Sequence, residues 1–249
     1  MENIILGIIQ GITEFVPISS SGHLALFSEF LKAELDVPYF AVLHLATFFA
    51  VVIFVWREIW DILKGIFSKD KKYLNLAGKL IVSTLPAIIV GFTIDNIIED
   101  AFSAIKVIAF FLIITAVMNF FSDRLKKEKK DLNSITYVDA LIIGLIQAFA
   151  IFPGISRSGS TIFAALLLGM TKKSAVKYSF LMSLPVTFGA GVLKISSVSF
   201  TSSQNIGIIL SFISGLFGLW VLKKAVISGK LKIFSIYCLV MSLFVFIYF

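Results

Sequence analysis

Two short polar stretches interrupt an otherwise apolar chain of 249 residues, and they hold the side chains that could do chemistry. The first, residues 17–23, reads Pro-Ile-Ser-Ser-Ser-Gly-His and closely follows Glu14. The second, residues 153–160, reads Pro-Gly-Ile-Ser-Arg-Ser-Gly-Ser. A carboxylate, hydroxyls, an imidazole and a guanidinium form the set that phosphoryl transfer needs, because that reaction depends on charge neutralisation, positioning and an activated nucleophile.

Glu14 is an ionisable residue within an apolar segment, and Gln10 lies one helical turn before it on the same face. A charged side chain at membrane depth costs about 2.5–3.5 kcal/mol on insertion scales unless it meets water or a partner. The pair therefore predicts a site for a hard divalent cation, Mg²⁺ or Ca²⁺, with the carboxylate and the amide oxygen as ligands. The structural alternative is a protonated Glu14 that only bonds a neighbouring helix.

Three consecutive serines, Ser19, Ser20 and Ser21, follow the first break. At a helix start, unpaired backbone N–H groups and the helix dipole favour an anion. One capping serine is the structural alternative, but three beside Gly22 and His23 exceed what a cap needs. His23 lies one helical turn from Ser20, where it could accept the hydroxyl proton or protonate a leaving oxygen; a purely structural histidine is the alternative.

Arg157 is the only Lys or Arg within the two polar stretches. A guanidinium binds two phosphate oxygens at once, and at a helix start it would be joined by backbone N–H groups. Gly154 and Gly159 beside it would let the backbone approach a ligand closely. The structural alternative is an ion pair between Arg157 and Glu14 that only holds the two segments together.

The two polar stretches belong to two copies of one element. Residues 7–23 align without a gap to residues 144–160, 137 positions later, with eight identities in 17 positions. Scaffold residues agree, whereas the reactive positions differ: Glu14 aligns with an isoleucine and Ser20 with Arg157. This divergence predicts one composite polar site built from both copies.

The composition is that of a membrane protein, with a mean hydropathy of +0.98 and 26 Phe. The net charge of +7 does not indicate a nucleic-acid surface, because 18 of the 22 Lys and Arg lie in four segments that separate apolar stretches, as in cytoplasmic loops. The single Cys238 excludes an internal disulfide and a cysteine zinc site. The apolar start lacks a basic leader and a cleavage site, so no signal peptide is expected. The basic segments are 57–79, 122–136, 171–177 and 223–232.

Six apolar stretches are long enough, or nearly so, to cross a bilayer as helices of about 20 residues. Two others, 4–31 and 137–170, break at the polar stretches, which predicts two re-entrant hairpins, since non-helical backbone at membrane depth is tolerated inside protein or a wet cavity. The expected fold class is an all-α polytopic membrane protein with six transmembrane helices plus two re-entrant helical hairpins. The expected spans are about 39–56, 80–94, 105–121, 178–195, 205–222 and 233–249.

Placing the basic segments inside the cell gives the two halves opposite orientations. The first hairpin then enters from outside and the second from the cytoplasm, and three spans follow each, so the chain is expected to be an inverted-topology repeat with a polar site near the midplane. The first repeat is 1–122, a cytoplasmic basic linker is 123–136, and the second repeat is 137–249. The chain is then expected to be a multi-pass protein of the cell (inner) membrane with both termini outside.

At these residues the whole chain resembles the undecaprenyl-pyrophosphate phosphatase family, also called the bacitracin-resistance protein family. The resemblance is carried by Gln10 and Glu14 running into Ser-Gly-His, and by Pro-Gly-Ile-Ser-Arg-Ser-Gly-Ser-Thr at 153–161. Members remove the terminal phosphate from a C55 isoprenoid pyrophosphate with the help of a divalent cation, and so regenerate the monophosphate carrier of bacterial wall synthesis.

The resemblance implies a role for each motif residue. Glu14 with Gln10 would form the metal and pyrophosphate site, and the Gln, where many members have Glu, should weaken metal binding. Ser20 would be the nucleophile and His23 its acid/base partner, although attack by His23 or by water stays open. Arg157 would complete the catalytic set. The implied phosphate-binding residues are Ser19, Ser21, Gly154, Ser156, Arg157, Ser158, Gly159 and Thr161.

Three other interpretations compete with membership of this family. A polyprenyl-phosphate transporter or flippase shares broken helices and inverted repeats but does not need the full reactive set. Another class of membrane lipid phosphatases needs a second His after its Ser-Arg motif, whereas His44 precedes it here. A purely structural bundle leaves the divergence of the two copies unexplained. The expected partners are an isoprenoid pyrophosphate lipid and the bilayer, with a homodimer as one option and no nucleic acid.

Overall fold

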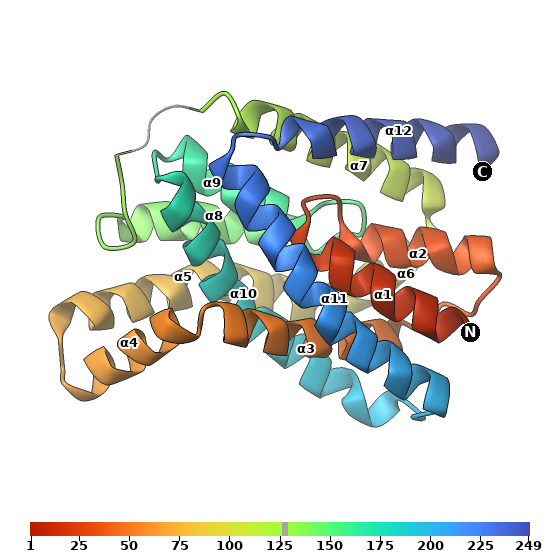
Figure 1. Cartoon of the computed structure of the whole chain (residues 1–249), viewed down its shortest axis with the longest axis horizontal. Coiled ribbons are helices and arrows are strands. Elements are labelled where there is room, and N and C mark those ends of the chain that lie inside the picture. The colour runs from red at the N-terminus through yellow and green to blue at the C-terminus, as the bar shows by residue number, and fades with distance from the viewer. Residues whose placement is uncertain (126–128) are drawn as a thin grey trace.

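The computed structural model describes residues 1–125 and 129–249, and these residues form an all-helical protein (Figure 1). That part of the chain contains 12 α-helices and one 3₁₀ turn, η1 (Ile195–Ser197). The predicted all-α class is therefore confirmed. The predicted basic linker 123–136 includes residues 126–128, which lie outside the described residues.

Each polar stretch separates two short helices. α1 (Glu2–Phe15) and α2 (Ser20–Leu31) flank the first stretch, while α8 (Tyr137–Phe149) and α9 (Arg157–Leu167) flank the second. The first break has a local cause: Val16 is extended, with φ −60° and ψ 130°, because a residue before proline is disfavoured in the helical conformation. Both halves thus contain the interrupted helix that the sequence predicts.

A serine hydroxyl caps the second helix of each pair. Ser19 accepts a hydrogen bond from the N–H of Gly22 at the start of α2, and Ser156 accepts one from the N–H of Gly159 at the start of α9. These bonds satisfy backbone donors that a helix start leaves open. Ser19 and Ser156 are aligned positions of the repeat, so the duplicated element keeps the same cap in both copies.

Five helices are long and apolar enough to cross a membrane by length and composition, with mean hydropathies from 1.3 to 2.2. A sixth apolar helix, at the end of the chain, has 17 residues. The six helices lie at the six expected spans. They are α3 (Val37–Phe54), α5 (Lys71–Thr93), α7 (Ile105–Ser122), α10 (Lys172–Lys194), α11 (Ser202–Ile227) and α12 (Lys232–Tyr248). α5 and α10 begin nine and six residues earlier than expected, and α11 ends five residues later, because these helices continue into the neighbouring basic segments.

Two further helices are absent from the sequence-based prediction. α4 (Trp56–Phe67) follows α3 with only Val55 between them, and α6 (Asp95–Ser103) precedes α7. On α4 the exposed rings of Trp56 and Trp60 stack with centroids 6.0 Å apart. Exposed tryptophans next to a charged segment are typical of a helix at a membrane–water boundary.

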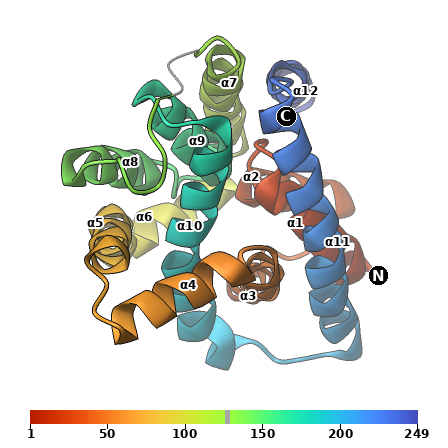
Figure 2. The same ribbon diagram turned by 60° about the vertical axis from the view of Figure 1, so that its left-hand side comes forward.

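The two halves interlock instead of packing as separate units. α1 packs against α11, and α8, its counterpart in the second half, packs against α5 (Figures 1 and 2). In the same way α3 packs against α10, and α7 lies beside α12. Each of these four contacts pairs a helix of the first half with one of the second.

Glycine permits a close approach of the helices at two of these crossings. A Cβ atom at Gly7 of α1 would lie 2.2 Å from the carbonyl oxygen of Gly207, and one at Gly144 of α8 would lie 2.6 Å from that of Ser83. Both positions therefore exclude any larger residue. Since Gly7 and Gly144 are aligned positions, the duplicated element makes the same kind of crossing twice.

The distribution of side chains is the reverse of that in a soluble domain. The polar side chains of Gln10, Glu14 and Gln147 are buried inside the bundle. Large apolar residues face outward instead: on α11, Ile209 and Phe217 are 58% and 56% exposed. An apolar outer face around a polar interior suits a lipid environment.

Candidate active site

The tips of the two broken helices meet inside the bundle. The backbone N–H of Gly154 donates to Ser19 Oγ over 2.9 Å, and Ser158 Oγ donates to the carbonyl oxygen of Phe15 over 2.9 Å. Gly154 has φ +100°, a conformation that L side chains rarely adopt. The predicted composite arrangement, with both polar stretches at one place, is present in the structure.

α7 holds the two tips together from the side. Thr115 Oγ1 donates to the carbonyl oxygen of Gly154 and accepts from the N–H of Ser156, each over 2.9 Å. Asn119 Nδ2 donates to the carbonyl oxygen of Pro17 over 2.6 Å. Irregular backbone inside the bundle is tolerated because protein groups such as these satisfy its polar atoms.

Glu14 is the centre of the site and is 6% exposed. Its Oε1 pairs with Arg157 Nη2, which comes from the other half of the chain. Its Oε2 accepts a hydrogen bond of 2.6 Å from Ser20 Oγ and one of 3.0 Å from Gln10 Nε2. The structure therefore brings together four residues that the sequence singles out, and it makes Glu14 the direct partner of the Ser20 hydroxyl.

His44 also contacts Glu14, and the sequence-based site does not include it. Its Nε2 lies 3.2 Å from Glu14 Oε2, while its Nδ1 lies 2.7 Å from the carbonyl oxygen of Phe40. A ring that donates to both oxygens carries a proton on each nitrogen and is a cation. In that form, Arg157 and His44 supply two positive charges beside one carboxylate, so the site favours an anionic ligand.

Among the described residues His23 makes no hydrogen bond to Ser20, although the sequence-based prediction pairs them. Its Nδ1 lies 2.8 Å from the carbonyl oxygen of Ser19, and its Nε2 lies 2.8 Å from Tyr237 Oη on α12. The ring stacks on Tyr237 with centroids 5.6 Å apart. Helical spacing places His23 and Ser20 on one side of α2, but Tyr237, distant in sequence, takes the nitrogen that could have faced Ser20.

A cavity of about 220 Å³ opens beside Glu14. Its polar wall includes Glu14, Ser20, Ser21, His44, Ser156 and Arg157, together with Gln147 and Thr187, and its apolar wall includes Phe40, Ile155 and Val186. An apolar cavity with a few convergent polar groups is the usual form of a small-ligand site. The other predicted site residues do not line it; these are Gln10, Ser19, His23, Gly154, Ser158, Gly159 and Thr161.

Most of the predicted site residues that do not line the cavity form hydrogen bonds with other groups of the protein. Thr161 Oγ1 donates to the carbonyl oxygen of Arg157 over 2.9 Å and lies 2.7 Å from Ser179 Oγ. Ser158 Oγ is held by Phe15, as described above, and lies 3.2 Å from Ser156 Oγ. Their hydroxyls shape the two tips that carry Ser20 and Arg157.

One buried oxygen beside Glu14 is left open for a divalent cation. Gln10 Oε1 is buried and has no hydrogen-bond partner in the described structure, while the Gln10 amide N–H is bonded to Glu14. Among the described residues, no three His, Cys, Asp or Glu side chains are grouped to hold a metal. Mg²⁺ commonly takes one or two protein carboxylates and completes its shell with water and substrate phosphates.

Comparison with known proteins gives one family. Residues 3–244 match the model of the bacitracin resistance protein BacA family. The chain is 58% identical over 245 residues to an undecaprenyl-diphosphatase of Methanococcus maripaludis strain C6, with 98% of each chain covered. It is 53% identical to one of Thermosipho africanus, with 99% of each chain covered, and 40% identical to one of Thermotoga petrophila, with 97% of each covered.

Proposed function

The chain belongs to the bacitracin resistance protein BacA family, and on this premise we propose that it is a multi-pass membrane undecaprenyl-diphosphatase. It hydrolyses the C55 isoprenoid pyrophosphate to the monophosphate and phosphate, which recycles the lipid carrier of cell-wall synthesis. The observation that carries the proposal is the cavity in which Ser20, Glu14 and Arg157 meet.

Substrate binding relies on positive charge and on open polar groups. Arg157 and His44 attract the pyrophosphate oxygens, and Ser21 and Ser156 on the cavity wall offer hydroxyl donors to them. Ser19, Ser158, Thr161, Gly154 and Gly159 contribute indirectly, because they hold the two tips in place. The apolar wall faces the first part of the isoprenoid chain.

Ser20 is the nucleophile, and Glu14 accepts its proton. The hydroxyl already donates to Glu14 Oε2 over 2.6 Å, within the range for a proton acceptor. The Ser20 Oγ–phosphorus bond forms as the bond from phosphorus to the bridging oxygen breaks, and the electron pair leaves on undecaprenyl phosphate. Water then hydrolyses the phosphoserine. His23 acts by fixing the start of α2, through Ser19 and Tyr237.

A divalent cation, Mg²⁺ or Ca²⁺, would be held by Glu14 and by Gln10 Oε1. When bound, it would neutralise charge on the pyrophosphate. Gln10 Oε1, which has no hydrogen-bond partner among the described residues, supports this proposal, since a buried amide oxygen without a hydrogen bond is costly.

The function is tested by phosphate release from C55 isoprenoid pyrophosphate by the detergent-solubilised protein, with and without EDTA. We expect release that EDTA abolishes and that added Mg²⁺ or Ca²⁺ restores. Release that is unaffected by EDTA would contradict the cation proposal alone. No release by well-folded protein would contradict the enzyme and favour a lipid-phosphate transporter.

Ser20→Ala and Ser21→Ala form a matched pair for the nucleophile. Ser20→Ala removes the attacking oxygen, so we expect kcat to fall by about 10²–10⁴-fold. Ser21→Ala removes one hydroxyl donor to the pyrophosphate but no reacting group, so we expect kcat to change by less than about threefold and the loss to appear in KM. Equal effects of the two substitutions would remove Ser20 from the nucleophile role and favour attack by water.

His44→Ala and His44→Gln test the histidine that contacts Glu14. Alanine leaves the Glu14 carboxylate without one donor and removes a positive charge, so we expect kcat/KM to fall by about 10–100-fold. Glutamine restores an N–H donor without the charge and should recover part of the loss. The measurement is phosphate release at several substrate concentrations; wild-type kinetics for His44→Ala would exclude His44 from the site.

The finer topology is also a proposal: six spans and two re-entrant hairpins form an inverted repeat in the cell membrane, with both termini outside. It is supported by the aligned Gly7 and Gly144, which make the same close crossing in both halves, and by the reciprocal packing of α1 on α11 and α8 on α5. A topology reporter fused after Phe249 should therefore read as outside. A cytoplasmic reading would contradict the opposite orientations of the halves.

A further inference from the structure

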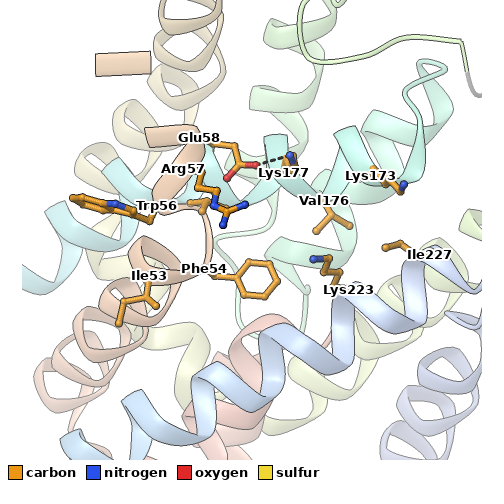
Figure 3. A pocket seen from close by; sticks show the side chains of 11 residues that line it. Ile53, Phe54, Trp56, Arg57, Glu58, Lys173, Val176, Lys177, Lys223 and Ile227 are labelled. Atoms are coloured by element: carbon orange, nitrogen blue, oxygen red, sulfur yellow. Dashed lines mark ion pairs between the residues drawn. The ribbon is translucent and has the colours of Figure 1, made fainter. Parts of the chain in front are cut away.

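A second cavity, of about 570 Å³, opens where the junction of α3 and α4 meets the start of α10 and the end of α11 (Figure 3). Four cationic side chains and one carboxylate line it, and they come from three separate segments of the chain. The cationic residues are Arg57, Lys173, Lys177 and Lys223, and the carboxylate is Glu58.

The positive charge of this cavity is only partly neutralised. Lys177 pairs with Glu58, as the dashed line in Figure 3 marks. Lys223 Nζ lies over the ring of Phe54, 5.2 Å from its centroid. Arg57 and Lys173 make no ion pair with any residue that the structure describes. One carboxylate against four cations leaves three positive charges in excess around the cavity.

Glu58 belongs to this charge balance as an anion. Burial by itself raises the pKa of Glu58, but the hydrogen bond from Lys177 and the charges of Lys177 and Lys223 outweigh it and hold the pKa below its usual value. The carboxylate therefore stays ionised at neutral pH and fixes Lys177 at the cavity wall. The other three cations are left to bind a ligand.

This cavity is separate from the one beside Glu14. α3 contributes His44 to the first cavity and Ile53 to the second, nine residues or about 14 Å further along the helix. α10 contributes Thr187 to the first and Lys177 to the second, which gives about 15 Å. Both spacings place the second cavity at the end of the bundle that carries the basic segments.

The rim of the cavity is apolar and faces outward. Ile53 and Trp56 are 58% and 54% exposed, and Ile227 is 41% exposed. Ile53 lies in the last turn of an apolar helix long enough to cross a membrane, and Trp56 begins the helix that follows it. Tryptophan is enriched at the level of lipid headgroups, so the charged interior and the apolar rim match the two parts of a phospholipid.

We propose that this second cavity binds the phosphate headgroup of an anionic membrane phospholipid. Arg57, Lys173 and Lys223 hold a phosphate group, which a lipid headgroup and free phosphate both offer. The exposed apolar rim favours the lipid, because the acyl chains lie against Ile53 and Ile227. This site is distinct from the proposed phosphatase site, and it does not depend on that function.

The test measures lipid binding to the full chain in neutral detergent micelles by thermophoresis. The probes are dioctanoyl phosphatidylglycerol, dioctanoyl phosphatidylcholine and inorganic phosphate. We expect phosphatidylglycerol to bind at least tenfold more tightly than phosphatidylcholine, and Lys173→Gln with Lys223→Gln to weaken it by about 10–30-fold, since each basic residue contributes about fivefold. Inorganic phosphate should not displace the lipid at equal concentration.

Lys69→Gln with Lys71→Gln is the matched control, because it removes the same charge from two exposed residues outside the cavity. It should change lipid binding by less than twofold. Both double variants should keep wild-type Tm and phosphate release, which separates lipid binding from folding and from catalysis. Equal weakening by the two double variants, or equal binding of the two lipids, would overturn the proposal. Displacement of the lipid by inorganic phosphate would overturn the assignment to a lipid.

Discussion

Glu14→Gln should lower phosphate release by about 10³-fold or more while the protein stays folded. The substitution keeps the size of the side chain but removes its charge. Ser20 Oγ then loses its proton acceptor, and Arg157 and His44 lose the anion that they share. The expected loss is therefore in kcat as well as in KM, measured by initial rates over a range of substrate and Mg²⁺ concentrations.

A matched control separates the site from a general effect of charge. Glu29→Gln makes the same substitution at an exposed residue of α2, and we expect rates within about twofold of the wild type. A Glu14→Gln protein with a wild-type Tm and more than a tenth of the wild-type rate would rule out Glu14 as the proton acceptor.

Arg157→Ala should be nearly as damaging, with a loss of about 10³-fold in kcat/KM. The Arg157 side chain is 17% exposed and lines the cavity, and Arg157 is the only described residue of α9 that pairs with Glu14. Arg157→Lys keeps the charge but not the planar fork, so we expect it to recover only part of the activity. Arg124→Ala, at an exposed arginine, is the matched control.

A double substitution distinguishes catalysis from simple support of the fold. If the ion pair only held the two tips together, each single variant would lose about 3–5 kcal/mol of stability through an unpaired buried charge. Glu14→Gln combined with Arg157→Gln would then restore Tm and activity together. We expect it to restore Tm but to leave the protein inactive; recovery of phosphate release would support the structural alternative.

The gathering of Glu14, Ser20 and Arg157 could be predicted because the duplicated element supplied two independent signals. An ionisable side chain in an apolar helix marks a functional site, and the aligned second copy shows where its partner belongs. The same signal was available for His44, which lies within the apolar helix α3. It was missed because His44 has no reactive neighbour in sequence, and its distance from Glu14 is set by the packing of α3 on α1.

Other details depended on tertiary contacts that spacing cannot show. Helical periodicity placed His23 on the same side as Ser20 but could not reveal that Tyr237, 214 residues later, would occupy its Nε2. α4 and α6 could not be predicted, because they are short and mix charged with apolar residues. Loops show the same pattern. The helix breaks themselves were predictable, because proline and serine act locally.

The interlocked halves have a consequence for how the protein is made. Asn3 Nδ2 donates to Ser203 Oγ across 200 residues of sequence, and α1 finds its partner in α11. At a synthesis rate of 5–20 residues per second, α1 waits about 10–40 s for α11, the helix against which it packs. For about the first 7–29 s Glu14 also lacks Arg157, which follows it by 143 residues. The nascent chain must therefore keep this carboxylate hydrated, or in contact with the insertion machinery, until the second half arrives.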